Sequence, residues 1–187
     1  MILLVDNDDS FTYNIVELLR RTTNEQVTVI NHRDLNVDLA AHYNAFIFSP
    51  GPSLPHDFPI MEQLLAQYDS SKAILGICLG HQAICEHYGA QLVQSDVVHH
   101  GEPSMIECNP DSMLFAGLTN TVVGRYHSWI ATNIPSELRI TARDSQGSVM
   151  AVEHLSKRVF GVQFHPESYI TEAGELILKN FIHATSK

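Results

Sequence analysis

Short apolar or β-branched runs recur along the chain and predict β-strands at residues 2–5, 27–30, 45–48, 73–77, 121–124, 138–142, 149–152 and 159–164. Segments with helical periodicity lie between the early runs, at residues 11–21, 59–68 and 79–88. Ser10 is a candidate N-cap for the first of them, and Gly89 ends the third. This alternation predicts an α/β fold with a doubly wound, mostly parallel sheet flanked by helices. After Gly101 several strands follow closely, which indicates a small antiparallel extension before a last helix at about residues 173–184.

Length and charge limit the classes of function. A chain of 187 residues that is 44% hydrophobic can bury one full core, so we expect residues 1–187 to form a single domain. Acidic residues outnumber basic ones 21 to 11, which argues against nucleic acid or an anionic membrane as the main partner. The apolar runs are far shorter than the roughly 20 residues of a membrane span, and no basic leader opens the chain, so we expect a cytoplasmic protein.

Three cysteines, Cys78, Cys85 and Cys108, form neither an even set for disulfides nor a metal-binding spacing, so we expect reduced thiols. Cys78 differs from the other two because it lies in the sequence GICLG, directly after a predicted strand and before a predicted helix. Flanking glycines permit the sharp turn of a nucleophile elbow, and a helix N-terminus stabilises negative charge on the sulfur. We therefore interpret Cys78 as a nucleophile. For Cys85 and Cys108 the more common role, that of a small buried residue, is retained.

A base for this nucleophile is predicted at His165, which follows the strand at residues 159–164. On an extended segment residues i and i+2 face the same way, so the carboxylate of Glu167 is expected to bind one imidazole nitrogen and orient the ring. We assign the pair His99 and His100 to a surface loop, because no further ligand lies at a spacing that would complete a metal site. Neither a metal nor a cofactor is expected.

The loop Ser49-Pro50-Gly51-Pro52-Ser53 follows the third predicted strand, where ligands bind in open α/β sheets. Because proline has no N–H, Gly51 is the natural donor within Pro50-Gly51-Pro52. Leu79, directly after the nucleophile, would supply a second N–H and complete an oxyanion hole. Gln82 lies one helical turn after Cys78, on the same face, where its amide could bind a polar substrate.

With these residues assembled, the sequence resembles the class I (triad) glutamine amidotransferases over nearly its whole length. More narrowly, DNDDSFTYN at residues 6–14, SPGP at 49–52, the cysteine elbow, RYHS at 125–128 and HPES at 165–168 resemble the glutaminase subunits of anthranilate and aminodeoxychorismate synthases. The resemblance implies that L-glutamine is the substrate and that ammonia passes to a chorismate-using synthase subunit, component I. It also implies that glutamine is held by Gln82, by the backbone of Ser128 and Trp129, and by Gly51, Pro52 and Ser53.

Four positions depart from the pattern of that family. Asp8 replaces a usual tyrosine, Ser53 a glycine, Glu102 a lysine and Trp129 a leucine. None belongs to the triad. Ser53 and Trp129 border the expected glutamine pocket, whereas we expect Asp8 and Glu102 to affect how the partner subunit docks.

Two other classes of function stay open at this point. The acidic residues that follow the first strand resemble those of a phosphoacceptor receiver domain, but the third strand is not followed by the aspartate such a domain needs. A stand-alone cysteine hydrolase of another amide would keep the fold and the triad. The sequence also leaves open whether the partner makes anthranilate, aminodeoxychorismate or both.

Overall fold

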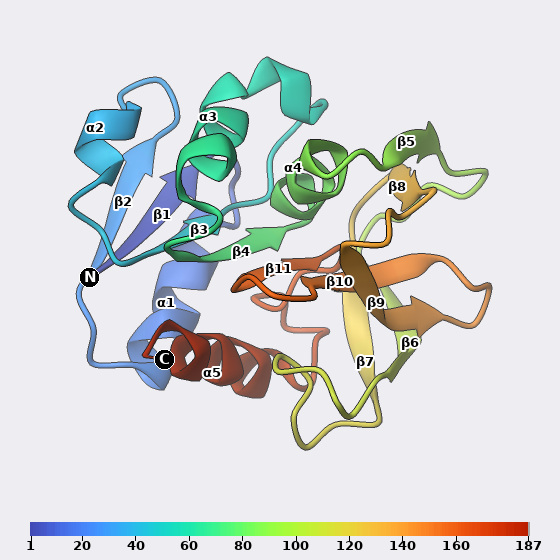
Figure 1. Ribbon diagram of the computed structural model, residues 1–187. Helices are drawn as coiled ribbons and strands as arrows, with labels where there is room; N and C mark the ends of the chain where they lie inside the picture. Colours follow the sequence, from blue (N-terminus) through green and yellow to red (C-terminus); the bar gives the residue numbers. More distant parts are fainter. Residues whose placement is uncertain (187) are drawn as a thin grey trace.

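A nine-stranded sheet is the frame of the computed structural model, which describes residues 1–186, and its strand order is β2-β1-β3-β4-β11-β10-β9-β6-β7 (Figure 1). The elements are β1 (Ile2–Asp6), α1 (Thr12–Thr22), β2 (Val27–Asn31), α2 (Val37–Ala40), β3 (Ala45–Phe48), the 3-10 helix η1 (Pro55–Asp57), α3 (Pro59–Tyr68), β4 (Ala73–Ile77), α4 (Leu79–His87), β5 (Gln91–Gln94), β6 (Glu102–Cys108), β7 (Asn120–Arg125), β8 (Trp129–Thr132), β9 (Leu138–Asp144), β10 (Val149–His154), β11 (Val159–Val162) and α5 (Gly174–Thr185).

The first part of the sheet is parallel. Strands β2, β1, β3, β4 and β11 pair in parallel, with α1 and α5 on one face and α2, α3 and α4 on the other (Figure 1). Because both faces are covered, β3 and β4 are apolar along their whole length and every residue in them is buried. The predicted doubly wound sheet is confirmed.

The second part of the sheet is antiparallel. Strands β10, β9, β6 and β7 continue it, and β5 and β8 form a separate two-stranded antiparallel sheet. The antiparallel extension expected after Gly101 is therefore present. The sequence pattern did not predict β5, β6 and β8 as separate strands, because their polar, partly exposed residues interrupt the apolar runs.

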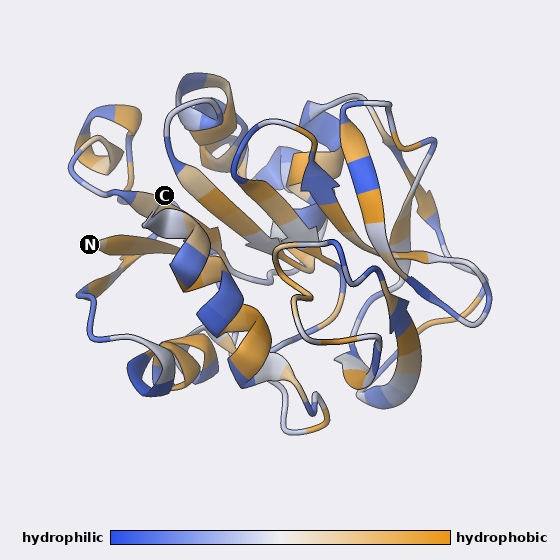
Figure 2. Cartoon of the chain, turned by 60° about the horizontal axis from the view of Figure 1, so that its bottom comes forward, coloured by the Kyte–Doolittle hydropathy of each residue, from blue (hydrophilic) through white to orange (hydrophobic). Residues whose placement is uncertain are grey.

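Each face of the sheet has its own hydrophobic core. On the side of α1 and α5, Ile15, Leu19 and Phe181 are fully buried, and on the side of α3 and α4, Phe46 and Leu64 are fully buried. In Figure 2 the central strands are mostly orange and the helices alternate between orange and blue, as amphipathic helices on a buried sheet should. Burial of one such side chain contributes about 1.5–3 kcal/mol, so these two layers hold the strand ends in place.

The structure corrects two details at element ends. Ser10 does not cap α1, because the helix begins at Thr12 and its N-cap position is Phe11, which makes no side-chain capping bond. Thr12 Oγ1 donates to Asp6 Oδ1 at 2.8 Å and links the start of the helix to β1. The strand expected at residues 159–164 ends at Val162, which leaves a short non-strand segment before His165. Within the described part of the chain, no helix is long and apolar enough to cross a membrane.

Candidate active site

Cys78 occupies a strained turn between β4 and α4. Its backbone has φ 51° and ψ −98°, outside the usual regions for a residue with a side chain, and the residue is buried at the helix N-terminus. The flanking glycines are required by packing: a Cβ on Gly76 would lie 2.3 Å from the backbone of Gly80, and one on Gly80 would lie 2.6 Å from Phe48 Cβ. The predicted elbow is present, with the thiol at its apex.

His165 and Glu167 form a close pair, with 2.6 Å between His165 Nδ1 and Glu167 Oε1 and both side chains buried. The predicted contact is present, but the predicted reason for it is wrong. Residues 165–168 form a turn rather than an extended segment, in which Ser168 N–H donates to the His165 carbonyl at 3.2 Å. Thr171 Oγ1 donates to the same carbonyl at 2.6 Å, so two hydrogen bonds to the His165 carbonyl stabilise the turn.

The environment of His165 favours its protonated form. Burial lowers the pKa of His165, but the nearby sulfur of Cys78 and the carboxylate of Glu167 outweigh it, and the pKa lies well above its usual value. Its Nε2 has no hydrogen-bond partner of ordinary geometry among residues 1–186, which leaves that nitrogen for the sulfur or for a substrate. The rings of Phe11 and Tyr126 pack on the imidazole at 5.4 and 4.8 Å and shield it from water.

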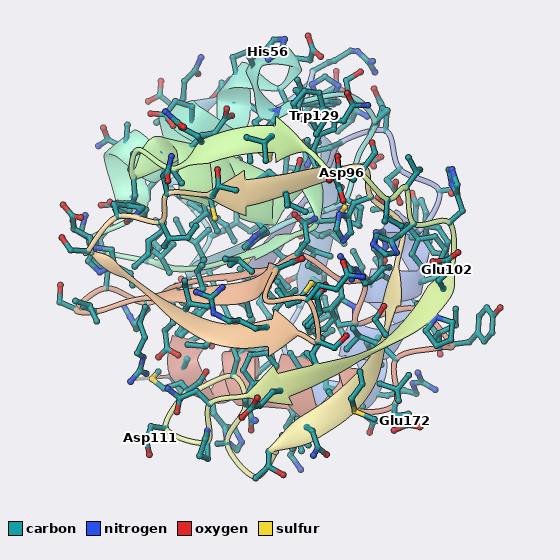
Figure 3. The ribbon with its side chains drawn as sticks, turned by 90° about the vertical axis from the view of Figure 1, so that its right-hand side faces the viewer. His56, Asp96, Glu102, Asp111, Trp129 and Glu172 are labelled. Atoms are coloured by element: carbon teal, nitrogen blue, oxygen red, sulfur yellow. The ribbon has the colours of Figure 1, made fainter. Side chains whose placement is uncertain are left out.

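A cavity of about 190 Å³ opens beside the sulfur. It is lined by Gly51, Pro52, Ser53, Cys78, Leu79, Gln82, Tyr126, His127, Ser128 and Trp129. The structure thus brings every pocket residue expected from the sequence to one place and adds Tyr126 and His127. Trp129, at the start of β8, lies in the upper part of Figure 3, and Asp111, between β6 and β7, lies in the lower part.

Two peptide N–H groups at this cavity are available to a ligand. Those of Gly51 and Leu79 have no hydrogen-bond acceptor within the described residues. The two residues are adjacent, since a Cβ on Gly51 would lie 2.6 Å from Leu79 Cδ2. Ser49 Oγ accepts from Asn7 N–H at 2.9 Å and ties the Gly51 loop to the end of β1. Paired donors on fixed backbone are what a developing oxyanion requires.

Comparison with known proteins places the chain in a family. Residues 3–185 match the family model described as glutamine amidotransferase class-I. The chain belongs to the class-I glutamine amidotransferases. The amidotransferase has a relative in Haemophilus influenzae, provisionally named component II of anthranilate synthase, that is 40% identical over 97% of this chain and 95% of its own length.

A second relative of the amidotransferase, the aminodeoxychorismate/anthranilate synthase component 2 of Bacillus subtilis, is 36% identical over 100% of this chain and 98% of its own. Among solved structures, a Thermoplasma acidophilum protein provisionally described as part of a GMP synthase has a TM-score of 0.90 at 23% identity, over 99% of this chain and 93% of its own. The fold and the glutamine-hydrolysing class predicted from the sequence are thereby confirmed.

Two of the departures from the family pattern have visible structural effects in the amidotransferase. Ser53, expected to be glycine, keeps a left-handed backbone with φ 63°. Asp8 accepts hydrogen bonds from Asn31 at 2.9 Å and from Arg33 Nη1 at 2.9 Å and lies 3.1 Å from His32 Nε2. The Asn31 amide and the Arg33 guanidinium lower the pKa of Asp8 to about 2, so its charge is firmly held on this surface.

The histidines outside the triad are placed differently from one another. His99 and His100 lie in the loop between β5 and β6, as expected, and His100 is exposed. The side chain of His99 is instead buried, with its Nδ1 3.2 Å from the Glu102 carboxylate and its ring 5.3 Å from that of His127. His81 is fully buried, and burial lowers its pKa to about 4. In residues 1–186 no group of three or more His, Cys, Asp or Glu side chains is arranged to hold a metal ion.

Sequence reasoning missed Gln163, whose Nε2 lies 3.7 Å from Cys78 Sγ. One signal was present: Gln163 is the one polar residue in the otherwise apolar stretch VFGVQF, and it is fully buried. A buried amide needs partners for its donors and acceptors, so its position alone indicates a specific contact.

Proposed function

We propose that this glutamine amidotransferase hydrolyses the side-chain amide of L-glutamine with Cys78 as nucleophile, His165 as acid and base, and Glu167 as the residue that orients His165. The observation that carries the proposal is the strained Cys78 turn at a cavity that also presents the free N–H groups of Gly51 and Leu79. The pair of His165 and Glu167, 2.6 Å apart, supports it.

In the first half of the reaction, Cys78 Sγ attacks the amide carbon of glutamine. The oxygen that becomes negative accepts hydrogen bonds from Gly51 N–H and Leu79 N–H. His165, whose raised pKa keeps a proton at hand, gives that proton to the leaving nitrogen. The C–N bond breaks, ammonia departs and a thioester remains on Cys78.

In the second half, His165 takes a proton from water, and the resulting hydroxide attacks the thioester. A second oxyanion forms in the same hole, the C–S bond breaks, and glutamate leaves while the thiol is restored. Glu167 keeps the imidazole oriented through both halves.

We propose that glutamine is held by the residues that line the cavity beside the sulfur, namely Gly51, Pro52, Ser53, Gln82, Ser128 and Trp129. Residues 1–187 would form a single amidotransferase domain. The predicted cytoplasmic location stays a prediction.

The partner is inferred from the names of the relatives. The relative in Lactococcus lactis is named anthranilate synthase component 2, and that in Bacillus subtilis is named aminodeoxychorismate/anthranilate synthase component 2. We propose that this chain forms a heterodimer with such a component I and passes ammonia to it, for tryptophan or folate biosynthesis. Direct transfer has a chemical advantage, because ammonia released into water at neutral pH is protonated and loses its nucleophilic lone pair.

The first test removes the nucleophile. Cys78→Ala should lower glutamine-dependent glutamate release by more than about 10³-fold, since both halves of the reaction pass through the sulfur. Cys85→Ala is the matched control: it lies in the same helix, is buried, and burial raises its thiol pKa far above the usual range. It should keep turnover. Substantial activity in Cys78→Ala would overturn the assignment.

The second test identifies the partner. The purified chain is mixed in turn with an anthranilate synthase and an aminodeoxychorismate synthase component I, with chorismate and glutamine, and the products are separated. Formation of one or both products names the branch. Absence of both, together with rapid hydrolysis of another amide by the chain alone, would support the stand-alone hydrolase instead.

A further inference from the structure

A series of hydrogen-bonded polar groups runs from the end of β9 to the sulfur of Cys78. It does not include His165 or Glu167. It begins at the ion pair between Arg125 Nη1 and Asp144 Oδ2, which lie 2.7 Å apart with both side chains buried. Arg125 Nε then donates to His127 Nε2 at 3.1 Å. Because a guanidinium nitrogen only donates, His127 Nε2 must accept and therefore carries no proton.

The protonation of His127 fixes the next contact. With Nε2 unprotonated, Nδ1 carries the hydrogen and donates to the backbone carbonyl of Trp129 at 3.0 Å. Burial and the charge of Arg125 lower the pKa of His127 to about 3, so this neutral form is held at every pH near neutrality. The same Trp129 carbonyl accepts from Gln82 Nε2 at 3.2 Å.

The Trp129 carbonyl also determines how two amides are turned. Since a carbonyl only accepts, Gln82 must present its NH2 group there, and the second N–H of that group donates to Gln163 Oε1 at 3.3 Å. Gln163 must then turn its own NH2 toward Cys78 Sγ, 3.7 Å away. If the Gln82 amide were reversed, its oxygen would face the Trp129 carbonyl oxygen. If the Gln163 amide were reversed, its NH2 group would face that of Gln82.

This orientation has two consequences at the cavity. Both N–H groups of Gln82 are used, so its carbonyl Oε1, which accepts no hydrogen bond from residues 1–186, is left as the acceptor that the cavity wall offers to a substrate. The sulfur receives an N–H donor from Gln163, a fully buried side chain.

We propose that Gln163 is a positioning residue for the amidotransferase reaction: one end of its amide directs the sulfur of Cys78, and the other fixes Gln82 so that an acceptor faces the substrate. The inference rests on the proposed function, because it takes Cys78 as the nucleophile and glutamine as the substrate. It adds a requirement that the triad does not contain, namely that the orientation of both amides is set by the Trp129 carbonyl, which Asp144 and Arg125 support through His127.

The test uses the chloroketone analogue of L-glutamine, which alkylates a thiol with loss of chloride, and iodoacetamide, which alkylates the same thiol without needing the glutamine site. Mass spectrometry measures the labelling rate of Cys78. Gln163→Met keeps the size of the side chain and removes both hydrogen bonds. Chloroketone labelling should fall about 10- to 100-fold, from the loss of two hydrogen bonds at a substrate site, and iodoacetamide labelling should fall much less.

Gln163→Glu tests whether the hydrogen bonds of this side chain matter, because a purely structural role would give no pH dependence of chloroketone labelling. A protonated carboxyl offers one acceptor and one O–H donor in the places of the amide, whereas a carboxylate offers only acceptors and faces Cys78, Gln82 and the pair of His165 and Glu167 with negative charge. Chloroketone labelling of Gln163→Glu, relative to wild type at the same pH, should therefore rise as the pH falls. The ratio for Gln163→Met should stay constant. If Gln163→Met does not fold, the pH dependence of Gln163→Glu relative to wild type still decides the test.

Gln67→Met, at an exposed position of α3, is the control for replacing a glutamine and should label as wild type does. Equal chloroketone labelling of Gln163→Met and wild type, or a Gln163→Glu ratio that does not vary with pH, would overturn the proposal for Gln163. Failure of the chloroketone to label Cys78 in the wild-type protein would instead overturn the proposed function.

Discussion

The parallel and antiparallel halves of the sheet contribute to the site in different ways. The parallel half supplies the groups of the proposed chemistry at strand ends: Cys78 follows β4, Gly51 follows β3 and His165 follows β11. The antiparallel half and the separate sheet of β5 and β8 supply groups that hold and orient, above all Arg125 at the end of β7 and Trp129 at the start of β8. Reactive groups therefore come from local turns, whereas their orientation depends on contacts between distant segments.

The largest effect on stability is expected in the antiparallel half. Arg125→Met leaves the carboxylate of Asp144 buried without its cation and should lower the free energy of unfolding by about 3–5 kcal/mol in urea denaturation. Adding Asp144→Asn should recover part of the loss, since the amide oxygen can still accept from the backbone N–H groups of Gln146 and Ser148. A loss below about 1 kcal/mol in Arg125→Met would show that the pair is not needed for folding.

Two glycines, one in each half, should respond differently to replacement by alanine. Gly76→Ala, in the parallel half, would place Cβ 2.3 Å from the backbone of Gly80 and should lower the free energy of unfolding by about 3 kcal/mol. It should also reduce glutamine hydrolysis, because the elbow must move. Gly147→Ala, in the hairpin between β9 and β10, meets open space but has φ 84°, and should cost only about 1 kcal/mol and leave hydrolysis intact. Similar losses in both variants would contradict this account.

Two buried histidines, one for each half, should respond to pH in opposite directions. The pKa of His127 is lowered by burial and by Arg125 to about 3, so below about pH 6.5 the unfolded chain binds a proton that the folded chain does not. Its contribution to stability therefore falls as the pH drops, by up to about 1.4 kcal/mol per pH unit. The pKa of His165 is raised, so its contribution is fully present below about pH 6.5 and is lost as the pH rises through the folded value.

The free energy of unfolding is measured across a pH series for wild type, His127→Gln and His165→Gln. The value for each variant is then subtracted from the value for wild type. The first difference should grow as the pH rises from about 4 to about 7, and the second should shrink above about 6.5. If both differences change in the same direction, one of the two protonation states is wrongly assigned.

The smallest effect concerns Ser53, at the rim of the cavity. Ser53→Gly removes the side chain from a left-handed backbone with φ 63° and should raise the free energy of unfolding by up to about 1 kcal/mol. Ser136→Gly, at an exposed position outside the set of positive-φ residues, is the control and should lower it slightly. A loss in Ser53→Gly would mean that the serine makes a stabilising contact that exceeds its strain.

Most of the parallel half could be predicted from the sequence, although α2 was not predicted and β11 ends two residues before the predicted strand. The bounds of β3, β4 and α3 agree with the predicted runs at residues 45–48, 73–77 and 59–68. The two strands are buried on both faces and are continuously apolar, and α3 repeats its buried apolar residues at helical spacing. In the antiparallel half, the runs at residues 121–124, 138–142 and 149–152 predicted β7, β9 and β10, whereas β5, β6 and β8 were not predicted. β5 and β6 are partly exposed and polar, so their strand conformation depends on pairing partners that the local sequence does not specify.

The same distinction explains what could be predicted of the site. Cys78, Gly51 and the pair of His165 and Glu167 are marked by neighbours in the sequence, such as glycines, prolines and a carboxylate two residues away. The neighbours of Gln163 show only that it interrupts an apolar run, and its partners Gln82 and Cys78 are 81 and 85 residues distant. The turn at residues 165–168 was also missed, because its carbonyl is held by Thr171 Oγ1 rather than by strand pairing.

Trp129 can serve as an intrinsic fluorescence probe of the cavity. It is the sole tryptophan of the 187-residue sequence, it is half-buried, and it lines the cavity beside the sulfur. Its indole emission therefore reports on one location, without the background that several tryptophans would add. Mixing the unlabelled protein with glutamine in a stopped-flow fluorimeter would follow filling of the cavity and release of glutamate in real time, and the same signal would register a synthase partner that covers the cavity.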